Sequence, residues 1–153
     1  MASKGGDRIM ELKNRSQYLD KLISVQDMEV IKVVTGIRRC GKSSLLKLMM
    51  VHLREQGVME EQILSMNFES MQFADMDSKR LYQYVIERTP KGKRLYLFLD
   101  EVQKVRDWQD AVNSFRVDLD CDIYVTGSNA YLLSSELSTY LSGRYQDAAA
   151  VLP

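Results

Sequence analysis

One octapeptide constrains this chain more than any other feature: GIRRCGKS, at positions 36–43, matches the pattern G-x-x-x-x-G-K-[ST] at every fixed position. The β-branched run from Val30 to Thr35 precedes it and predicts a strand. A helix rich in Leu and Met is expected from Lys42 to Glu55, ended by Gly57. A strand, a glycine-containing loop and a helix in this order form a P-loop, which binds the phosphates of a nucleoside triphosphate.

Each part of this loop has a physical reason. Glycines let the backbone curl so that successive N–H groups face an anion, and the helix N-terminus adds unpaired N–H groups and the positive end of its dipole. We expect the Lys42 ammonium to reach the β- and γ-phosphates and the Ser43 hydroxyl to ligate Mg²⁺. The residues expected to bind the phosphates are Gly36, Ile37, Arg38, Arg39, Cys40, Gly41, Lys42, Ser43 and Ser44.

An acidic pair follows a second constrained segment. The unbroken apolar run LYLFL, from Leu95 to Leu99, predicts a strand buried on both faces, and Asp100 and Glu101 come directly after it. Such a strand delivers its terminal acids to the carboxyl edge of a parallel sheet, where α/β proteins bind ligands. We expect Asp100 to hold Mg²⁺ and Glu101 to act as the general base that polarises the attacking water. This Walker B pattern with a glutamate, and the absence of an N-K-x-D sequence, favour ATP over GTP.

The rest of the chain alternates between strand and helix patterns. Repeated βαβ units predict an α/β fold, a P-loop NTPase of three layers, α/β/α, with a mainly parallel sheet. A fifth strand after Arg144 is weakly indicated, and Asp107 is placed to cap a helix that starts at Trp108. The further expected elements are helices within 9–22, 78–88 and about 130–141, and strands at 63–68 and 123–126.

Three further residues, in two segments, are candidates for the catalytic site. Ser128 and Asn129 follow the fourth expected strand, and either could orient the attacking water or only cap the next helix. Arg144 follows the end of a predicted helix and could neutralise charge on the transferring γ-phosphoryl group, or be an ordinary surface arginine.

Composition excludes some classes of function. Lys and Arg number 21, and Asp and Glu also number 21, which argues against a dedicated nucleic-acid binder. No apolar run approaches the roughly 20 residues of a membrane span. The two cysteines, Cys40 and Cys121, lack metal-ligand spacing, so we expect a reducing, cytoplasmic setting.

Three segments together resemble a family of AAA+-type bacterial and archaeal ATPases: TGIRRCGKSSLL at 35–46, LFLDEVQKVRDW at 97–108 and YVTGSNAYLLSSELSTYLSGRY at 124–145. The resemblance extends over about 15–145. It implies an AAA+-like strand order, Lys42 and Ser43 on phosphate and Mg²⁺, and Asp100 and Glu101 on Mg²⁺ and water. It also implies that Ser128 and Asn129 lie in the sensor region, and that Arg144 could act as an arginine finger.

The resemblance also bears on domain organisation. Members of that family continue beyond the ATPase domain with a large C-terminal region, often with a DNA-binding-like fold. We therefore expect residues 1–14 to form an N-terminal extension and residues 15–153 an ATPase domain truncated before such a region. A protein or DNA partner would contact the absent part, and the AAA+ resemblance suggests assembly into an oligomer.

Three functions remain open from the sequence. The first is an ATPase that drives a conformational change in a longer protein. The second is a binding module that senses the nucleotide without turnover. The third is a small-molecule kinase, which is disfavoured because the segment from Ser70 to Pro90 has no arginine-rich lid.

Overall fold

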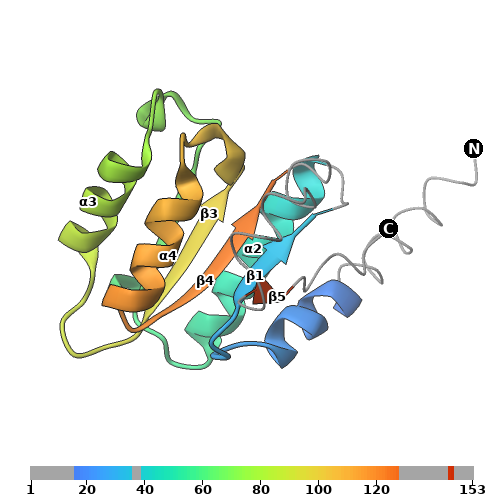
Figure 1. Cartoon of the computed structure of the whole chain (residues 1–153). Helices are drawn as coiled ribbons and strands as arrows, with labels where there is room; N and C mark the ends of the chain where they lie inside the picture. The colour runs from blue at the N-terminus through green and yellow to red at the C-terminus, as the bar shows by residue number, and fades with distance from the viewer. Residues whose placement is uncertain (1–15, 36–38, 128–144, 147–153) are drawn as a thin grey trace, which may run out of the picture.

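The computed structural model describes residues 16–35, 39–127 and 145–146, which form a parallel sheet with helices on both faces (Figure 1). The strand order is β2-β3-β4-β1-β5, and every pair of neighbouring strands is parallel. The expected α/β/α fold and its strand order are therefore confirmed, with the fourth strand between the first and third. The strands are β1 (Ile31–Val34), β2 (Ile63–Asn67), β3 (Leu95–Asp100), β4 (Cys121–Thr126) and β5 (Tyr145–Gln146).

Helices form the two outer layers. Figure 1 shows α3 and α4 side by side over one face of the sheet, with α2 behind it. No helix in the described part of the chain is both long and apolar enough to cross a membrane. The helical segments are residues 16–24, α2 (Arg39–Glu55), α3 (Ser78–Arg88) and α4 (Trp108–Asp118), with short 3-10 turns η1 (Glu60–Gln62), η2 (Met71–Phe73) and η3 (Val102–Lys104).

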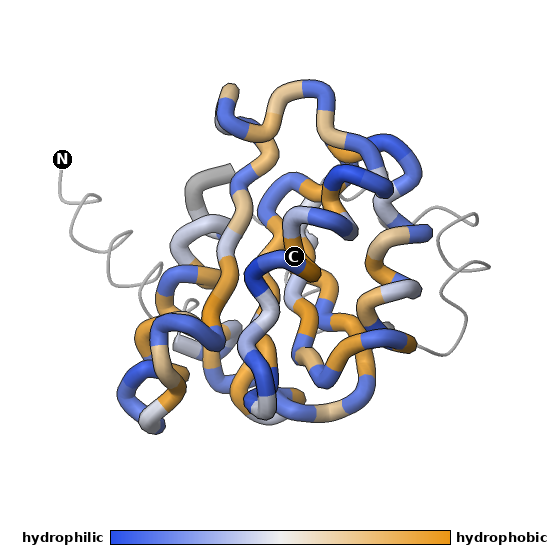
Figure 2. The backbone as a smooth tube through the Cα atoms, turned by 90° about the vertical axis from the view of Figure 1, so that its left-hand side faces the viewer, coloured by the Kyte–Doolittle hydropathy of each residue, from blue (hydrophilic) through white to orange (hydrophobic). Residues whose placement is uncertain are grey.

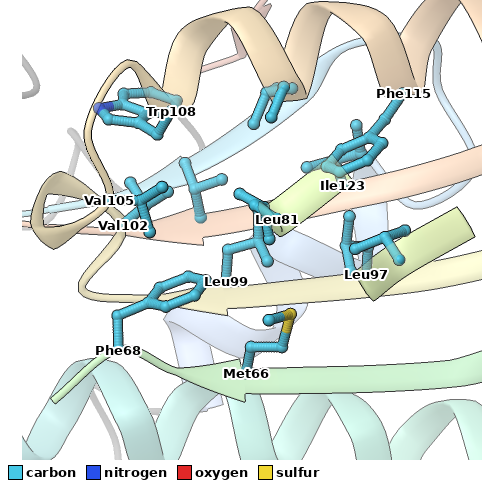
Figure 3. Packing of buried hydrophobic residues seen from close by; sticks show 14 of the residues in the cluster. Met66, Phe68, Leu81, Leu97, Leu99, Val102, Val105, Trp108, Phe115 and Ile123 are labelled. Atoms are coloured by element: carbon cyan, nitrogen blue, oxygen red, sulfur yellow. The ribbon is translucent and has the colours of Figure 1, made fainter. Parts of the chain in front are cut away.

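Strand β3 separates two hydrophobic cores. Leu97 and Leu99 pack against α3 and α4, together with the fully buried Trp108 and Phe115 (Figure 3). The intervening Phe98 belongs to the other core, which α2 and residues 16–24 cover. Successive side chains of a strand point to opposite faces, so an unbroken apolar run is what two covered faces require. The prediction that this strand is buried on both faces is confirmed.

The helices show the complementary pattern. In Figure 2 hydrophobic and hydrophilic residues alternate along the tube, as expected of helices that bury one side. On α3 the buried residues are Leu81 and Val85, four residues apart and therefore on one side of the helix. The expected bounds of α3, 78–88, agree with the structure.

Helix α2 differs from its expected start but ends as expected. It begins at Arg39, three residues before Lys42, so the last part of the predicted loop already belongs to the first helical turn. At the other end Gly57 has a left-handed backbone, φ +94°, which glycine adopts without a Cβ clash. Its N–H donates to Arg54 O (3.0 Å) and the N–H of Val58 to Leu53 O (3.0 Å), the paired bonds of a Schellman motif.

The prediction that Asp107 caps α4 with its side chain is wrong. Asp107 stands just before the helix, but it makes no side-chain capping bond. A capping side chain requires an extended backbone at that position, whereas Asp107 is left-handed, at φ 55° and ψ 36°. Its carbonyl instead accepts from the N–H of Asp110 (3.0 Å).

A buried ion pair lies at the opposite, amino edge of the sheet. Lys32 on β1 and Asp122 on β4 contact each other, and both side chains are 0% exposed. Asp122 also accepts from the Tyr124 hydroxyl (2.7 Å) and the N–H of Asp27 (3.0 Å), while Lys32 Nζ donates to Met28 O (2.7 Å). Burial lowers the pKa of Lys32 although Asp122 opposes this shift. The network joins the turn before β1 to the centre of the sheet.

We predict that Lys32→Met lowers the free energy of unfolding by about 3–5 kcal/mol, because it leaves the Asp122 carboxylate buried without its cation. Urea unfolding measures the change. Lys47→Met, on the exposed side of α2, is the matched control and is expected to stay within about 0.5 kcal/mol of the wild type. The double variant Lys32→Met/Asp122→Asn is expected to recover part of the loss. Equal free energies of unfolding for Lys32→Met and Lys47→Met would show that the buried ion pair does not stabilise the fold.

Candidate functional site

Lys42 lies at the carboxyl edge of the sheet, in the second half of the first turn of α2. Its side chain is only 8% exposed. The Nζ atom donates to the carbonyl of the buried Gly127 (2.8 Å), which directly follows β4, and lies 3.3 Å from Glu101 Oε1. A buried ammonium is tolerated only where anionic or polar acceptors surround it, and two chain segments supply them here.

Asp100 connects three elements. Its Oδ2 accepts from the Ser43 hydroxyl on α2 (2.5 Å), and its Oδ1 accepts from the Thr126 hydroxyl at the end of β4 (2.5 Å). Leu99 pairs with Val125 across the sheet, so the next residue on each strand comes together as well. Both carboxylate oxygens are thereby fixed, on a residue that is 6% exposed.

Thr126 serves two neighbours at once. While its hydroxyl donates to Asp100, the same oxygen accepts from the backbone N–H of Glu101 (2.9 Å). A hydroxyl offers one donor and two acceptor lone pairs, so both bonds are compatible. Thr126 therefore fixes the side chain of Asp100 and the backbone of Glu101 relative to β4.

Glu101 has a constrained conformation. Its backbone is left-handed, φ 59° and ψ 50°, which costs a non-glycine residue on the order of 1–3 kcal/mol. Its Oε2 accepts from Gln103 Nε2 (2.6 Å), and its Oε1 faces Lys42. Burial acts to raise the pKa of Glu101, but the hydrogen bond from Gln103 and the charge of Lys42 outweigh it and leave that pKa below its ordinary value.

The structure thus brings Lys42, Ser43, Asp100 and Glu101 into one connected cluster. Four other expected phosphate-binding residues lie in the first turns of α2: Arg39, Cys40, Gly41 and Ser44. The remaining predicted site residues lie outside the described part of the chain: Gly36, Ile37, Arg38, Ser128, Asn129 and Arg144. The roles assigned to all these residues stay predictions.

Sequence reasoning missed three members of this cluster: Thr126, Gly127 and Gln103. A signal existed for Thr126, since the last residue of the strand beside β3 lies at the same edge as Asp100, but Ser128 and Asn129 follow shortly after it and are more polar. Nothing in the sequence pointed to Gly127, which contributes a backbone carbonyl. The contact between Gln103 and Glu101 depends on the turn that the chain makes after Glu101, which the sequence pattern does not reveal.

The donor set fits a nucleoside triphosphate with Mg²⁺. The Ser43 hydroxyl and the Asp100 carboxylate share a hydrogen bond, so a hard cation can find two oxygen ligands side by side. Beside them Lys42 presents a buried, positively charged donor at the start of a helix, which is the arrangement that phosphate requires.

Comparison with known proteins gives the family. The sequence model of the AAA domain family matches residues 29–153. An uncharacterised protein of Haemophilus influenzae is 45% identical over 134 residues, which cover 86% of this chain and 34% of that protein. An uncharacterised protein of Methanocaldococcus jannaschii is 27% identical over 137 residues, covering 88% and 30%. The chain thus spans about a third of the length of these relatives.

Solved structures support the same fold. A chain in the structure of Drosophila ORC bound to AT-rich DNA and Cdc6 superposes with a TM-score of 0.60, covering 100% of this chain and 60% of that chain. At 11% sequence identity this likeness shows the fold alone. With the family match over residues 29–153, we conclude that the chain belongs to the AAA domain family, whose fold is that of a nucleotide-binding, ATPase-like module.

Proposed function

We propose that this chain binds ATP with Mg²⁺ at the carboxyl edge of its sheet and hydrolyses it there, as the ATPase module of a longer protein. One observation carries the proposal: three segments far apart in the sequence meet through direct contacts between Lys42, Ser43, Asp100, Glu101 and Thr126. A lysine, a hydroxyl and two acids are the groups with which P-loop NTPases hold phosphate and Mg²⁺ and position the attacking water.

For binding, we assign the loop from Gly36 to Gly41 to the phosphates through its backbone N–H groups. Lys42 would exchange its contacts with Gly127 O and Glu101 for phosphate oxygens. Ser43 and Asp100 would hold Mg²⁺, which when bound neutralises phosphate charge and orients the γ-phosphoryl group. The lack of an N-K-x-D sequence supports ATP over GTP.

For turnover, Glu101 is assigned as general base. A water oxygen attacks the γ-phosphorus, the bond from that phosphorus to the β–γ bridging oxygen breaks, and the water proton passes to the Glu101 carboxylate before release to solvent. The ion pair with Lys42 places the carboxylate beside the group that would hold the γ-phosphate. We further assign Asn129, two residues after Gly127, to orient the water, and Arg144, directly before β5, to neutralise the transferring group.

The output of hydrolysis is assigned to the remainder of the longer protein, since the relatives are about three times the length of this chain. Its partner would be a protein or DNA. The DNA and Cdc6 named for the Drosophila ORC structure belong to that assembly. In one variant of this proposal the AAA domains associate into an oligomer, and Arg144 acts on a neighbouring subunit. ATPase activity measured at several protein concentrations tests this variant.

We predict that Lys42→Ala weakens ATP binding about 10- to 100-fold, because a charged hydrogen bond to phosphate is worth about 1.5–3 kcal/mol. Titration of a fluorescent ATP analogue in the presence of Mg²⁺ measures the affinity. Lys47→Ala removes an exposed lysine from the same helix and should bind as the wild type does. Wild-type affinity in the Lys42→Ala protein would refute the phosphate site.

We predict that Glu101→Gln retains ATP affinity but hydrolyses bound ATP about 10²–10⁴-fold more slowly, the usual contribution of a general base. Single-turnover release of labelled phosphate measures the rate, and Glu87→Gln on the exposed side of α3 is the control. Loss of binding in Glu101→Gln, or an unchanged rate, would contradict the role of Glu101. ATP binding without hydrolysis by the wild-type protein would favour the nucleotide-sensing alternative. Transfer of the labelled phosphate to a metabolite would favour the kinase.

A further inference from the structure

The turn that follows β3 folds back on itself. Left-handed Glu101 is followed at once by η3, in which the N–H of Lys104 donates to Glu101 O (3.2 Å) and that of Val105 to Val102 O (3.0 Å). Val102 and Val105 point into the core beside Trp108 (Figure 3), and they are 0% and 1% exposed. The turn is thus anchored on both sides of Gln103. The tight winding returns the Gln103 amide to the Glu101 carboxylate.

The two oxygens of Glu101 are held unequally. Oε2 accepts a short bond, 2.6 Å, from Gln103, which belongs to the same anchored turn. Oε1 lies 3.3 Å from Lys42 Nζ, which belongs to α2 and makes its closer contact, 2.8 Å, with Gly127 O. The contact with Lys42 is therefore the looser of the two, and it is the one that a phosphate group would replace.

The side-chain amide of Gln103 is bonded to Glu101 through its nitrogen only. Its Oε1 is buried and, within the described residues, has no hydrogen-bond partner. A buried, unpaired carbonyl oxygen is unfavourable, so this oxygen gives no reason for an amide at this position, whereas the bond from Nε2 to Glu101 does. The reverse orientation of the amide would set its oxygen against the Glu101 carboxylate, so the negative charge of Glu101 fixes which way the amide points.

We propose that Gln103 is a positioning residue that tethers Oε2 of Glu101, so that Oε1 faces the attacking water once Lys42 bonds to phosphate. This rests on the proposed function of Glu101 as general base. Thr126 fixes the same residue at its backbone N–H, so Glu101 is held at both ends by residues from two different elements. A general base must stand within hydrogen-bonding reach of the proton it takes, and a carboxylate with one oxygen tethered loses the rotations that would carry it away.

The test is Gln103→Met in the purified protein, with Gln83→Met as matched control. Gln83 also donates through its side-chain amide to a glutamate, Glu87 Oε1 (3.0 Å), but on the exposed side of α3. We expect Gln103→Met to slow single-turnover ATP hydrolysis about tenfold and to change ATP affinity less than about twofold. Gln103→Asn keeps the amide on a chain one methylene shorter and is expected to be equally slow. Gln83→Met should change neither quantity.

A double variant separates positioning from a general structural role. Because Gln103 acts through Glu101, Gln103→Met is expected to cause no further slowing in the Glu101→Gln background. Additive slowing, or a loss of ATP affinity equal to the loss of rate, would overturn the proposal. If Glu101→Gln hydrolyses ATP slowly but Gln103→Met and Gln103→Asn both hydrolyse it at the wild-type rate, only the positioning role of Gln103 is overturned. Wild-type hydrolysis in Glu101→Gln would overturn the general base and the positioning role with it.

Discussion

The burial of β3 on both faces is the constraint on which the rest of the molecule depends. Leu97 and Leu99 fill one core and Phe98 fills the other, so the strand can neither shift by one residue nor turn over without placing its side chains in the wrong layer. Its register with β4 then brings Asp100 to Thr126 at the carboxyl edge. Hydrophobic packing along the strand therefore brings the acids to this edge, and the hydrogen bonds with Ser43, Thr126 and Gln103 then orient them.

Charges are buried at both edges of the sheet, but they are compensated differently. At the amino edge Lys32 and Asp122 are both 0% exposed, and their further bonds to Met28, Asp27 and Tyr124 join the preceding turn to the sheet. At the carboxyl edge Lys42 has one short bond to Gly127 and a longer contact with Glu101. A loosely held lysine agrees with the anionic ligand proposed for the carboxyl edge, whereas a pair with no exposed surface agrees with a fixed junction.

The fold and the centre of the site could be predicted from sequence because local signals and spacing agree there. The octapeptide at 36–43, the apolar run before Asp100 and the helix within 78–88 each carry their own pattern. The misses arise where one residue's role depends on a distant one. The strand pattern around Lys32 does not reveal that its side chain is buried against Asp122, 90 residues away. Asp107 is a residue type that often caps helices, but its left-handed backbone does not allow the capping bond. Thr126 and Gln103 acquire their contacts only through register and a left-handed turn.

The left-handed backbone of Glu101 explains why its surroundings are so fully bonded. A strained residue persists only where neighbouring contacts offset its cost. Here the N–H of Glu101 bonds to Thr126, its carbonyl accepts from Lys104, and Val102 and Val105 bury the turn beneath it. A relaxed, extended residue would continue the line of β3 and carry the carboxylate away from Lys42. The strain is therefore what turns the carboxylate of a strand-terminal glutamate back across the edge of the sheet, toward the start of α2, where a phosphate would be held.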